Sequence, residues 1–379
     1  MSTSGSLPFA AHVSSASFRD ILVHDRLRAS KFLSGGTTRG TAASVDVTDS
    51  GVTYTASVGV GVPATQYTLL IDTGSSNTWI GAGTKYVRTS TSQSTGNKVT
   101  VSYGSGSFSG TEYTDTVTLA PELVVQGQSI GVASTATGFS DVDGILGIGP
   151  VDLTSGTVSG QSSVPTVTDN LFSQGIIAAD SIGISYQPST SIGTTNGELD
   201  FGGVDTAKVT GDVSYVPITA SAPASSYWGI DQSITYGSGT AVLESTSGIV
   251  DTGTTLLLLA TSAFQAYTKA TGAVLDSATG LLVITQDQFE NLQPLYFNIG
   301  DVSYELNPNA QIWPRELNST LGGEESKIYL VVADLGSDVG QGLDFINGFV
   351  FLQRFYSVFD TGNKQVGLAT TPFTDAETN

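Results

Sequence analysis

The sequence of 379 residues predicts a mainly β fold, with two duplicated β-rich lobes and a functional cleft between them. Its 45 glycines, its many Ser, Thr and Val residues and its few charges favour short strands and turns over helices. An apolar run ending in Asp-Thr-Gly occurs in each half, at residues 70–76 and 249–255. A glycine-punctuated apolar stretch follows each run, at 144–150 and 345–350. The two halves therefore repeat over about 180 residues, a period too long for a solenoid.

Local patterns predict the individual elements. Residues 15–32 show roughly helical apolar spacing, and the Gly- and Thr-rich stretch 34–40 is typical of a flexible, cleavable linker. Alternating side chains begin near residue 45 and predict strands. The expected elements after the linker are strands at 52–60 and 67–71, a hairpin at 99–108, short helices at 167–174 and 262–271, and strand-like structure at 197–217, where the lobes meet.

Composition excludes several classes of function. No apolar run approaches the roughly 20 residues needed to cross a membrane, so no membrane association is expected. Without cysteine the chain has no disulfide, thiol nucleophile or thiolate metal site. A net charge of −20 and a pI near 4.1 would repel phosphates, so no nucleic-acid partner is expected. The N-terminus lacks the apolar core of a secretory signal, which was either removed from this sequence or never present.

Asp-Thr-Gly occurs three times, and two copies have the context of a reactive site. Asp72 and Asp251 each end an apolar run, and hydroxyl residues follow each of them, Ser75 in the first copy and Thr254 in the second. Two such loops, brought face to face, would set two carboxylates side by side. The third copy, at Asp360, is followed by Asn and an alternating run, a pattern typical of a hairpin turn.

A carboxylate pair of this kind has a defined chemistry. Two carboxylates a few ångströms apart cannot both ionise easily, so they share one proton and titrate together. The ionised partner can take a proton from a water molecule held between them, while the protonated partner donates to a peptide carbonyl. This chemistry needs no metal, no cofactor and no covalent intermediate.

The hairpin tip Tyr103-Gly104-Ser105-Gly106 is the second candidate feature of the site. Glycine-rich tips are mobile, and a tyrosine on one can close over a cleft. The same four letters recur at 236–239, but that copy lies 15 residues before Asp251, whereas Tyr103 lies 31 residues after Asp72. Only the first copy has the spacing to fold back over an Asp loop, so the second is interpreted as a plain turn.

Taken together, these features resemble the pepsin-like aspartic proteases, and most closely their fungal, cysteine-free members. The resemblance covers about residues 43–372. It implies a bilobal pepsin-like fold, with an N-terminal lobe over 42–212 and a C-terminal lobe over 213–379. Asn347 stands where that family usually has an apolar residue. The residues that match the family's site are the catalytic pair Asp72 and Asp251, the adjoining Thr73, Gly74, Ser75, Thr252, Gly253 and Thr254, the flap residues Tyr103, Gly104 and Ser105, and Trp79 packed behind the flap.

The resemblance implies a secreted acid endopeptidase that cuts between bulky hydrophobic residues and is inhibited by statine-type transition-state mimics. Its expected partners are peptide or protein substrates, and a monomer is expected. If the chain is secreted, Asn318 in Asn318-Ser319-Thr320 is a candidate glycosylation site. One alternative is a catalytically silent pepsin-like module that binds peptides or proteins. Another is a structural or carbohydrate-binding β-sandwich, which has no reason to duplicate Asp-Thr-Gly.

The charge of the chain is unevenly distributed. Residues 1–41 hold five basic residues, two acidic residues and both histidines, whereas the other 338 residues carry a net charge of −23. The basic segment 1–41 (the head) and the acidic remainder of the chain (the body) have opposite charge, which predicts that the head binds the body by electrostatic attraction. We expect 1–41 to be an inhibitory prosegment, with Lys31, or alternatively Arg39, against the Asp72–Asp251 pair. It would detach as carboxylates protonate below about pH 4. A basic tail without an inhibitory role is the alternative.

Overall fold

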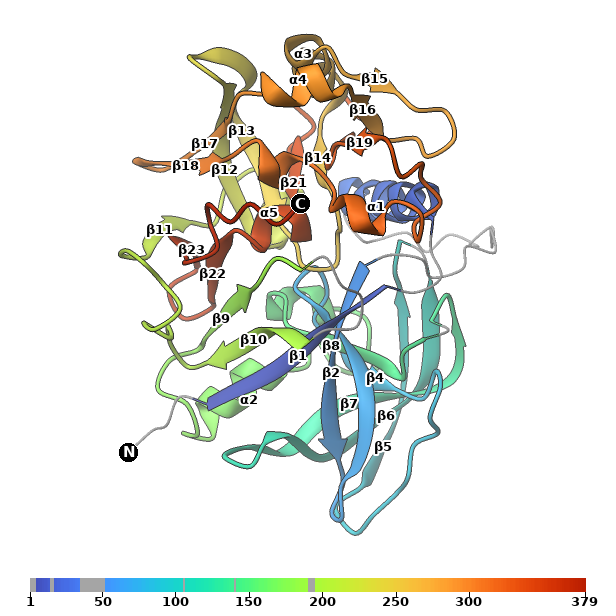
Figure 1. The fold of residues 1–379 in the computed structure, drawn as a ribbon. Coiled ribbons are helices and arrows are strands. Elements are labelled where there is room, and N and C mark those ends of the chain that lie inside the picture. Colours follow the sequence, from blue (N-terminus) through green and yellow to red (C-terminus); the bar gives the residue numbers. More distant parts are fainter. Residues whose placement is uncertain (1–4, 14–16, 35–51, 105, 140, 190–194) are drawn as a thin grey trace.

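The described part of the chain is built on two large β-sheets, one of 13 strands and one of seven, with a small sheet of three strands. The computed structural model describes residues 5–13, 17–34, 52–104, 106–139, 141–189 and 195–379. Figure 1 shows the two lobes one above the other, and confirms the predicted mainly β, bilobal class. No helix in these ranges is long and apolar enough to span a membrane.

The 13-stranded sheet builds the N-terminal lobe and then continues between the lobes. The strands of the N-terminal lobe are, in spatial order, β2 (Val52–Val60), β3 (Thr65–Asp72), β8 (Gly144–Gly147), β4 (Thr78–Ile80), β7 (Leu123–Thr137), β6 (Ser107–Ala120) and β5 (Gln93–Ser102). The strands between the lobes are β11 (Ser214–Pro217), β23 (Gln365–Thr370), β22 (Phe355–Asp360), β9 (Ser181–Tyr186), β10 (Thr195–Phe201) and β1 (Gly5–Val13). Both strands found in the stretch 197–217 belong to this second group, as predicted. The expected lobe boundary at 212/213 falls between them.

The C-terminal lobe contains the seven-stranded sheet and the three-stranded sheet. Its strands are, in spatial order, β18 (Val302–Leu306), β17 (Leu295–Ile299), β12 (Gly229–Tyr236), β13 (Thr240–Val250), β21 (Phe345–Asn347), β14 (Leu257–Leu259) and β20 (Val332–Asp334), then β15 (Val274–Leu275), β16 (Leu282–Ile284) and β19 (Ile328–Tyr329). The helices are α1 (Phe18–Leu33), α2 (Val167–Ser173), α3 (Thr261–Thr271), α4 (Gln286–Glu290) and α5 (Phe349–Leu352), with 3-10 turns at Val151–Thr154, Ala224–Ser226, Asn309–Gln311 and Arg315–Leu317.

Each lobe repeats one arrangement around its Asp-Thr-Gly loop. β3 runs parallel to β8, and β13 runs parallel to β21, so the loop leaves the sheet beside an apolar, glycine-punctuated strand in both cases. A Cβ atom on Gly147 would lie 2.7 Å from the carbonyl oxygen of Asn77, and one on Gly348 would lie 2.7 Å from that of Thr254. Glycine is needed at both positions because the chain leaving the Asp loop passes directly over it.

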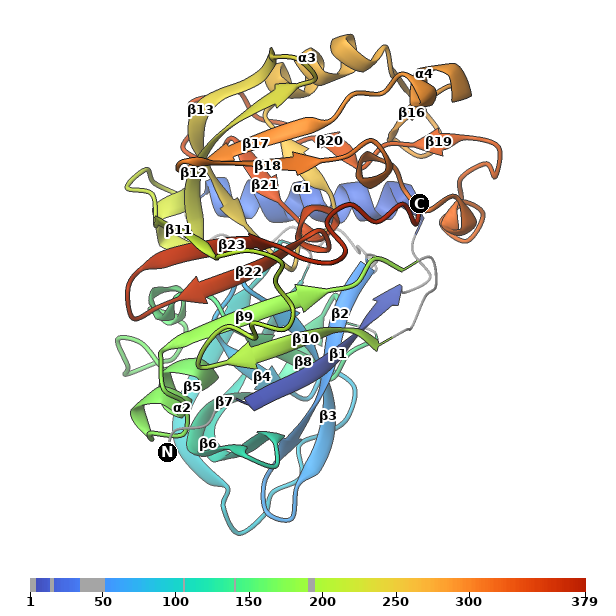
Figure 2. The same cartoon turned by 60° about the vertical axis from the view of Figure 1, so that its left-hand side comes forward.

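Residues 5–13 and 17–34 are integrated with both lobes. β1 pairs antiparallel with β10 on one side and with β2 on the other. No periodic pattern in the sequence predicts this strand, which contains Pro8. Its extended conformation depends on pairing with β10 and β2. Helix α1 starts at a capping box formed by Ser17 and Asp20, and Figure 2 shows it lying between the lobes. The predicted linker, from residue 35 onward, and residues 45–51 fall outside the described residues, whereas the strands predicted at 52–60 and 67–71 are present as β2 and β3.

Candidate active site

The two Asp-Thr-Gly loops meet at the centre of the molecule. The backbone nitrogen of Thr73 donates to the hydroxyl of Thr252 at 3.0 Å, and the backbone nitrogen of Thr252 donates to the hydroxyl of Thr73 at 2.9 Å. This reciprocal pair locks the loops together across the lobe boundary. In the first loop, Asp72 is fully buried and accepts from the Gly74 nitrogen at 3.0 Å and from the Ser75 hydroxyl. Both donors fix the orientation of this carboxylate.

The second loop repeats these contacts. Asp251 is fully buried and accepts from the Gly253 nitrogen at 3.2 Å and from the Thr254 hydroxyl at 2.6 Å. Its own nitrogen donates to the carbonyl of Asn347 at 3.2 Å. The buried Asn347 side chain is satisfied by Gln232, because each amide donates to the other, at 2.8 and 3.2 Å. A polar residue is tolerated at this apolar family position because it has this partner.

One cation joins the two carboxylates. The guanidinium of Arg28, on α1, donates to both oxygens of Asp251, through Nε at 2.6 Å and Nη2 at 2.9 Å, and Nη2 also contacts Asp72. Arg28 is itself buried and lies 5.0 Å from the ring centroid of Phe32. Phe32 in turn packs against Tyr227, with ring centroids 4.7 Å apart. The helix therefore fills the space directly above both Asp loops.

This contact corrects the expectation that Lys31 or Arg39 faces the pair. Arg28 lies on the buried face of α1 with Ile21, Asp25 and Phe32, whereas Lys31 is only partly buried and Arg39 lies outside the described residues. Two charged residues on the apolar face of the helix are the sequence signal that identifies the docking residues. The expectation did not consider which face of the helix each charged residue occupies.

Burial and charge act in opposite directions on this triad. Burial alone would raise the pKa of Asp251, but the neighbouring Arg28 guanidinium and the Thr254 hydroxyl outweigh it and hold the pKa below its usual range. Burial would lower the pKa of Arg28, but Asp251 and Asp72 raise it overall. The arginine is thus locked in its charged form, and the pair faces it as an anion.

The hairpin tip closes over the helix. Tyr103 lies between Trp79, with ring centroids 6.4 Å apart, and Phe139, at 5.4 Å, so Trp79 packs behind the tip. Burial raises the pKa of the Tyr103 hydroxyl. A Cβ atom on Gly104 would lie only 2.5 Å from the Cα of Arg28, so the tip rests on the helix backbone and only glycine fits there. Among the expected flap residues, Ser105 lies outside the described part of the chain.

The other two repeated motifs form turns, as predicted. Asp360 ends β22, and its carboxylate accepts from Asn363 and Gln365 within the hairpin to β23. Tyr236 ends β12 in the hairpin to β13. Neither residue contributes to the arrangement around Arg28.

The glycosylation candidate Asn318 lies inside the fold. Asn318 is fully buried, and its amide nitrogen donates to the carbonyl oxygens of Lys327 at 2.8 Å and Glu324 at 3.3 Å. A glycan on this nitrogen would have to replace both hydrogen bonds and open the surrounding packing. The sequon therefore serves as a structural turn in the folded chain.

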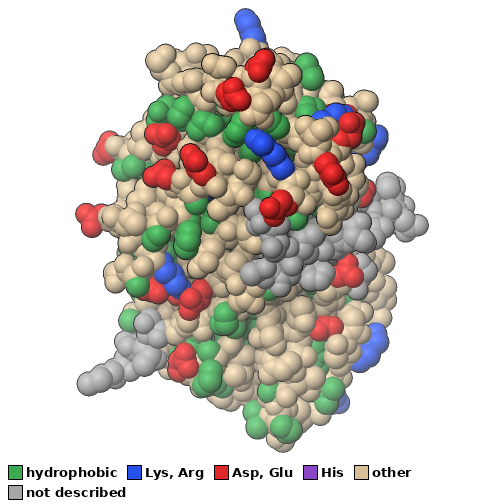
Figure 3. Space-filling view, viewed as in Figure 1, with side chains coloured by type: hydrophobic (Ala, Val, Ile, Leu, Met, Phe, Trp, Pro, Cys, Tyr) green, Lys and Arg blue, Asp and Glu red, His purple; other side chains and the backbone are tan. Residues whose placement is uncertain are grey.

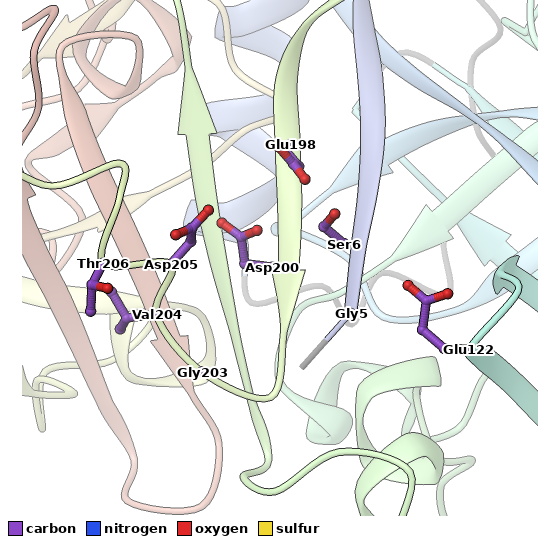
Figure 4. Close-up of a pocket in the computed structure, with 9 residues that line it drawn as sticks. All are labelled: Gly5, Ser6, Glu122, Glu198, Asp200, Gly203, Val204, Asp205 and Thr206. Atoms are coloured by element: carbon purple, nitrogen blue, oxygen red, sulfur yellow. The ribbon is translucent and has the colours of Figure 1, made fainter. Parts of the chain in front are cut away.

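A polar cavity of about 460 Å³ lies beside the start of β1 (Figure 4). Its lining carboxylates include Glu122, Glu198, Asp200 and Asp205. The ammonium of Lys208 lies 2.7 Å from Glu198 and 2.9 Å from Asp200, and neutralises part of this charge. Within the described ranges, no group of three or more His, Cys, Asp or Glu side chains could hold a metal ion.

The fold and the paired Asp loops define a pepsin-like aspartic protease. Residues 53–371 match the family profile described as Eukaryotic aspartyl protease, so the chain belongs to that family. It is an acid endopeptidase, a hydrolase whose substrates are peptides or proteins. The alternative of a silent binding module is not favoured, because both Asp-Thr-Gly triplets are intact.

Polyporopepsin from Irpex lacteus is 62% identical over 340 residues, which cover 89% of this chain and 100% of that protein. Pepsin A from Suncus murinus is 31% identical over 334 residues, covering 83% and 80%. The crystal structure of the aspartic proteinase from Irpex lacteus matches with a TM-score of 0.86 and 55% identity, over 100% of both chains. The predicted likeness to fungal members of the pepsin-like family is confirmed.

Proposed function

We propose that Asp72 and Asp251 are the catalytic pair and that they activate one water molecule by general acid–base catalysis. The observation that supports this most directly is the Arg28 guanidinium, which binds both carboxylates at once. Two oxygens that share one small cation are also close enough to share a water molecule or a proton. When the helix has left, the ionised carboxylate takes a proton from that water, and the protonated one donates to the peptide carbonyl.

The surrounding residues hold the pair in this state. The hydroxyls of Ser75 and Thr254 and the reciprocal Thr73–Thr252 bonds fix the orientation of both carboxylates. Preorganised donors of this kind lower the barrier because they need no rearrangement when charge develops. Tyr103, at the tip of the hairpin, would then close over an extended peptide.

The substrate preference that we propose is for bulky apolar residues on both sides of the cut. The walls near the pair are aromatic and include Trp79, Tyr103, Phe139 and Tyr227. Such walls favour apolar side chains by burial of their surface. The flap position that carries an Asp in some fungal relatives, where it accepts Lys before the cut, is Ser105 here, so cleavage after Lys should be poor.

We also propose that residues 1–41 are an inhibitory prosegment and that the enzyme is secreted, of fungal origin, and works as a monomer. α1 occupies the space that a substrate needs, with Arg28 on the pair and the Tyr103 hairpin resting on it. Both histidines lie in the head, so the body has nine basic residues and no histidine. Below about pH 4, when most carboxylates lose their charge, such a body builds little positive self-repulsion. Figure 3 shows acidic side chains scattered over one face with few basic ones.

Digestion of an acid-denatured protein at pH 3.5, with and without a statine-type transition-state mimic, tests this proposal. We expect cuts between apolar residues that the mimic blocks. In parallel, the full chain is incubated at pH 7 and at pH 3.5, and its mass and activity are followed together. Full activity of the intact chain from the first moment, unchanged by deletion of residues 1–41, would rule out the prosegment role.

A further inference from the structure

A carboxylate on the buried face of α1 forms a contact that is separate from the arginine. Asp25 is fully buried, and its oxygens accept from the backbone nitrogens of Thr255, at 3.1 Å, and Leu256, at 2.7 Å. These two N–H groups follow directly after the second Asp-Thr-Gly loop and are themselves buried. The body thus offers an anion receptor made of main-chain donors, and the head fills it with a carboxylate.

Burying this carboxylate and these two N–H groups costs free energy unless each of them has a hydrogen-bond partner. A buried carboxylate without partners loses its hydration, and two buried N–H groups without an acceptor lose theirs. Hydrogen bonds to an ionised group are roughly twice as strong as neutral ones. The pairing therefore stabilises the docked helix through a contact that does not involve the catalytic carboxylates.

Asp25 and Arg28 are one turn apart, so they anchor the same helix at two neighbouring points. Arg28 binds Asp251, and Asp25 binds the chain four and five residues further on. Each contact contains one carboxylate, but on opposite partners. In the Arg28 contact the carboxylates belong to the catalytic pair, and in the Asp25 contact the carboxylate belongs to the head.

We propose that Asp25 is a second autoinhibitory latch, which holds the head on the second catalytic loop through the backbone N–H groups of Thr255 and Leu256. This inference rests on the proposed prosegment role of residues 1–41. An amide in place of this carboxylate keeps one acceptor but sets an N–H donor against a backbone N–H group. Replacing Asp25 by Asn should therefore weaken the latch without changing the catalytic pair.

Two titratable or charged side chains lie near Asp25 on its own helix. The Nδ1 atom of His24 lies 3.3 Å from Oδ1 of Asp25, and the guanidinium of Arg28 binds the catalytic pair. The next charged residue along the helix, Arg26, pairs with Asp334 at 3.4 Å. The contact of Asp25 with the two N–H groups is thus separate from the contact of Arg28 with the catalytic pair.

The test compares the full chain with its Asp25→Asn, Arg28→Gln and Arg19→Gln variants. Arg19 is the control, because it is a charged residue on the same helix that is exposed and takes no part in the capping box. Conversion to the shorter form is followed by mass between pH 6.5 and 3.5. Amide hydrogen exchange of a peptide spanning 252–258 reports directly on the two N–H groups, and circular dichroism checks that each variant is folded.

We expect Asp25→Asn to convert about tenfold faster or more near pH 5.5. Residues 255 and 256 of this variant should lose protection at neutral pH, whereas Arg19→Gln behaves like the parent. If Arg28→Gln accelerates conversion but Asp25→Asn leaves rate and protection unchanged, the latch is refuted and the prosegment role stands. If neither variant nor deletion of 1–41 changes activity, the prosegment role fails, and the latch fails with it.

Discussion

Arg28 and Asp251 form a closed fork, with Nε 2.6 Å from Oδ2 and Nη2 2.9 Å from Oδ1. The same Nη2 reaches Asp72, so a single side chain of the head neutralises the pair on which the chemistry depends. All three groups are buried, and this contact cannot coexist with a substrate at the same place.

We predict that Arg28→Gln raises the initial activity of the full chain on a peptide substrate near pH 5.5 by about tenfold or more. The Arg28 contact lowers the pKa of Asp251, so its contribution to docking is complete above the usual Asp value of about 3.9. That contribution is lost as pH falls through the lowered value. Lys31→Gln is the control, since it removes a charge from the same helix away from the pair. Equal activation by both variants would contradict this assignment.

Much of this arrangement follows from local patterns. The duplicated Asp-Thr-Gly loops, the Tyr103 hairpin and the turn at Asp360 are each readable from apolar runs and glycine positions. The contact between Arg28 and Asp251 cannot be read from such local patterns, because it depends on which face of α1 packs against the two lobes. β1 is also unpredicted, since its sheet neighbours and not its own sequence determine its conformation. The burial of Asn318 shows the same limit, because the sequon does not reveal that its amide is already bonded.

The N-terminal lobe should become less stable as pH rises, because of Glu112. This side chain is buried on β6, and burial raises its pKa to about 7, although the hydroxyl of Ser129 acts in the opposite direction. Its neutral form is favoured by folding, so stability is complete below the unfolded value of 4.5 and declines as pH rises from there to about 7. The loss is on the order of 3 kcal/mol. Glu112→Gln should flatten thermal stability against pH over this window, and an unchanged slope would exclude Glu112 as the cause.

The Asn347–Gln232 amide pair should behave as a unit. Asn347→Leu leaves the buried amide of Gln232 without a partner and should cost about 1–3 kcal/mol in the free energy of unfolding. The double variant Asn347→Leu/Gln232→Leu should recover much of this loss, because no polar group is then unsatisfied. Denaturant unfolding of the parent, both single variants and the double variant gives the coupling energy. Additive losses would show that the two amides are independent.

Specificity should respond to the flap position 105. Ser105→Asp should increase cleavage after Lys in a peptide library, because a carboxylate there can pair with a lysine before the cut. Ser105→Asn is the uncharged control of similar size, and should leave the apolar preference unchanged. A parent enzyme that already cuts mainly after Lys or Arg would contradict the proposed apolar preference.

The most direct test of the catalytic assignment compares three identical changes, Asp72→Asn, Asp251→Asn and Asp360→Asn. Because an inactive variant cannot remove its own head, a recognition site for an unrelated protease is placed after residue 41 and cut in every sample. Hydrolysis of a peptide substrate is then measured at pH 3.5, with circular dichroism as the check on folding. We predict that the first two variants are folded and inactive, and that Asp360→Asn stays within a few-fold of the parent. A folded, active Asp251→Asn enzyme beside a folded, inactive Asp360→Asn enzyme would contradict the account.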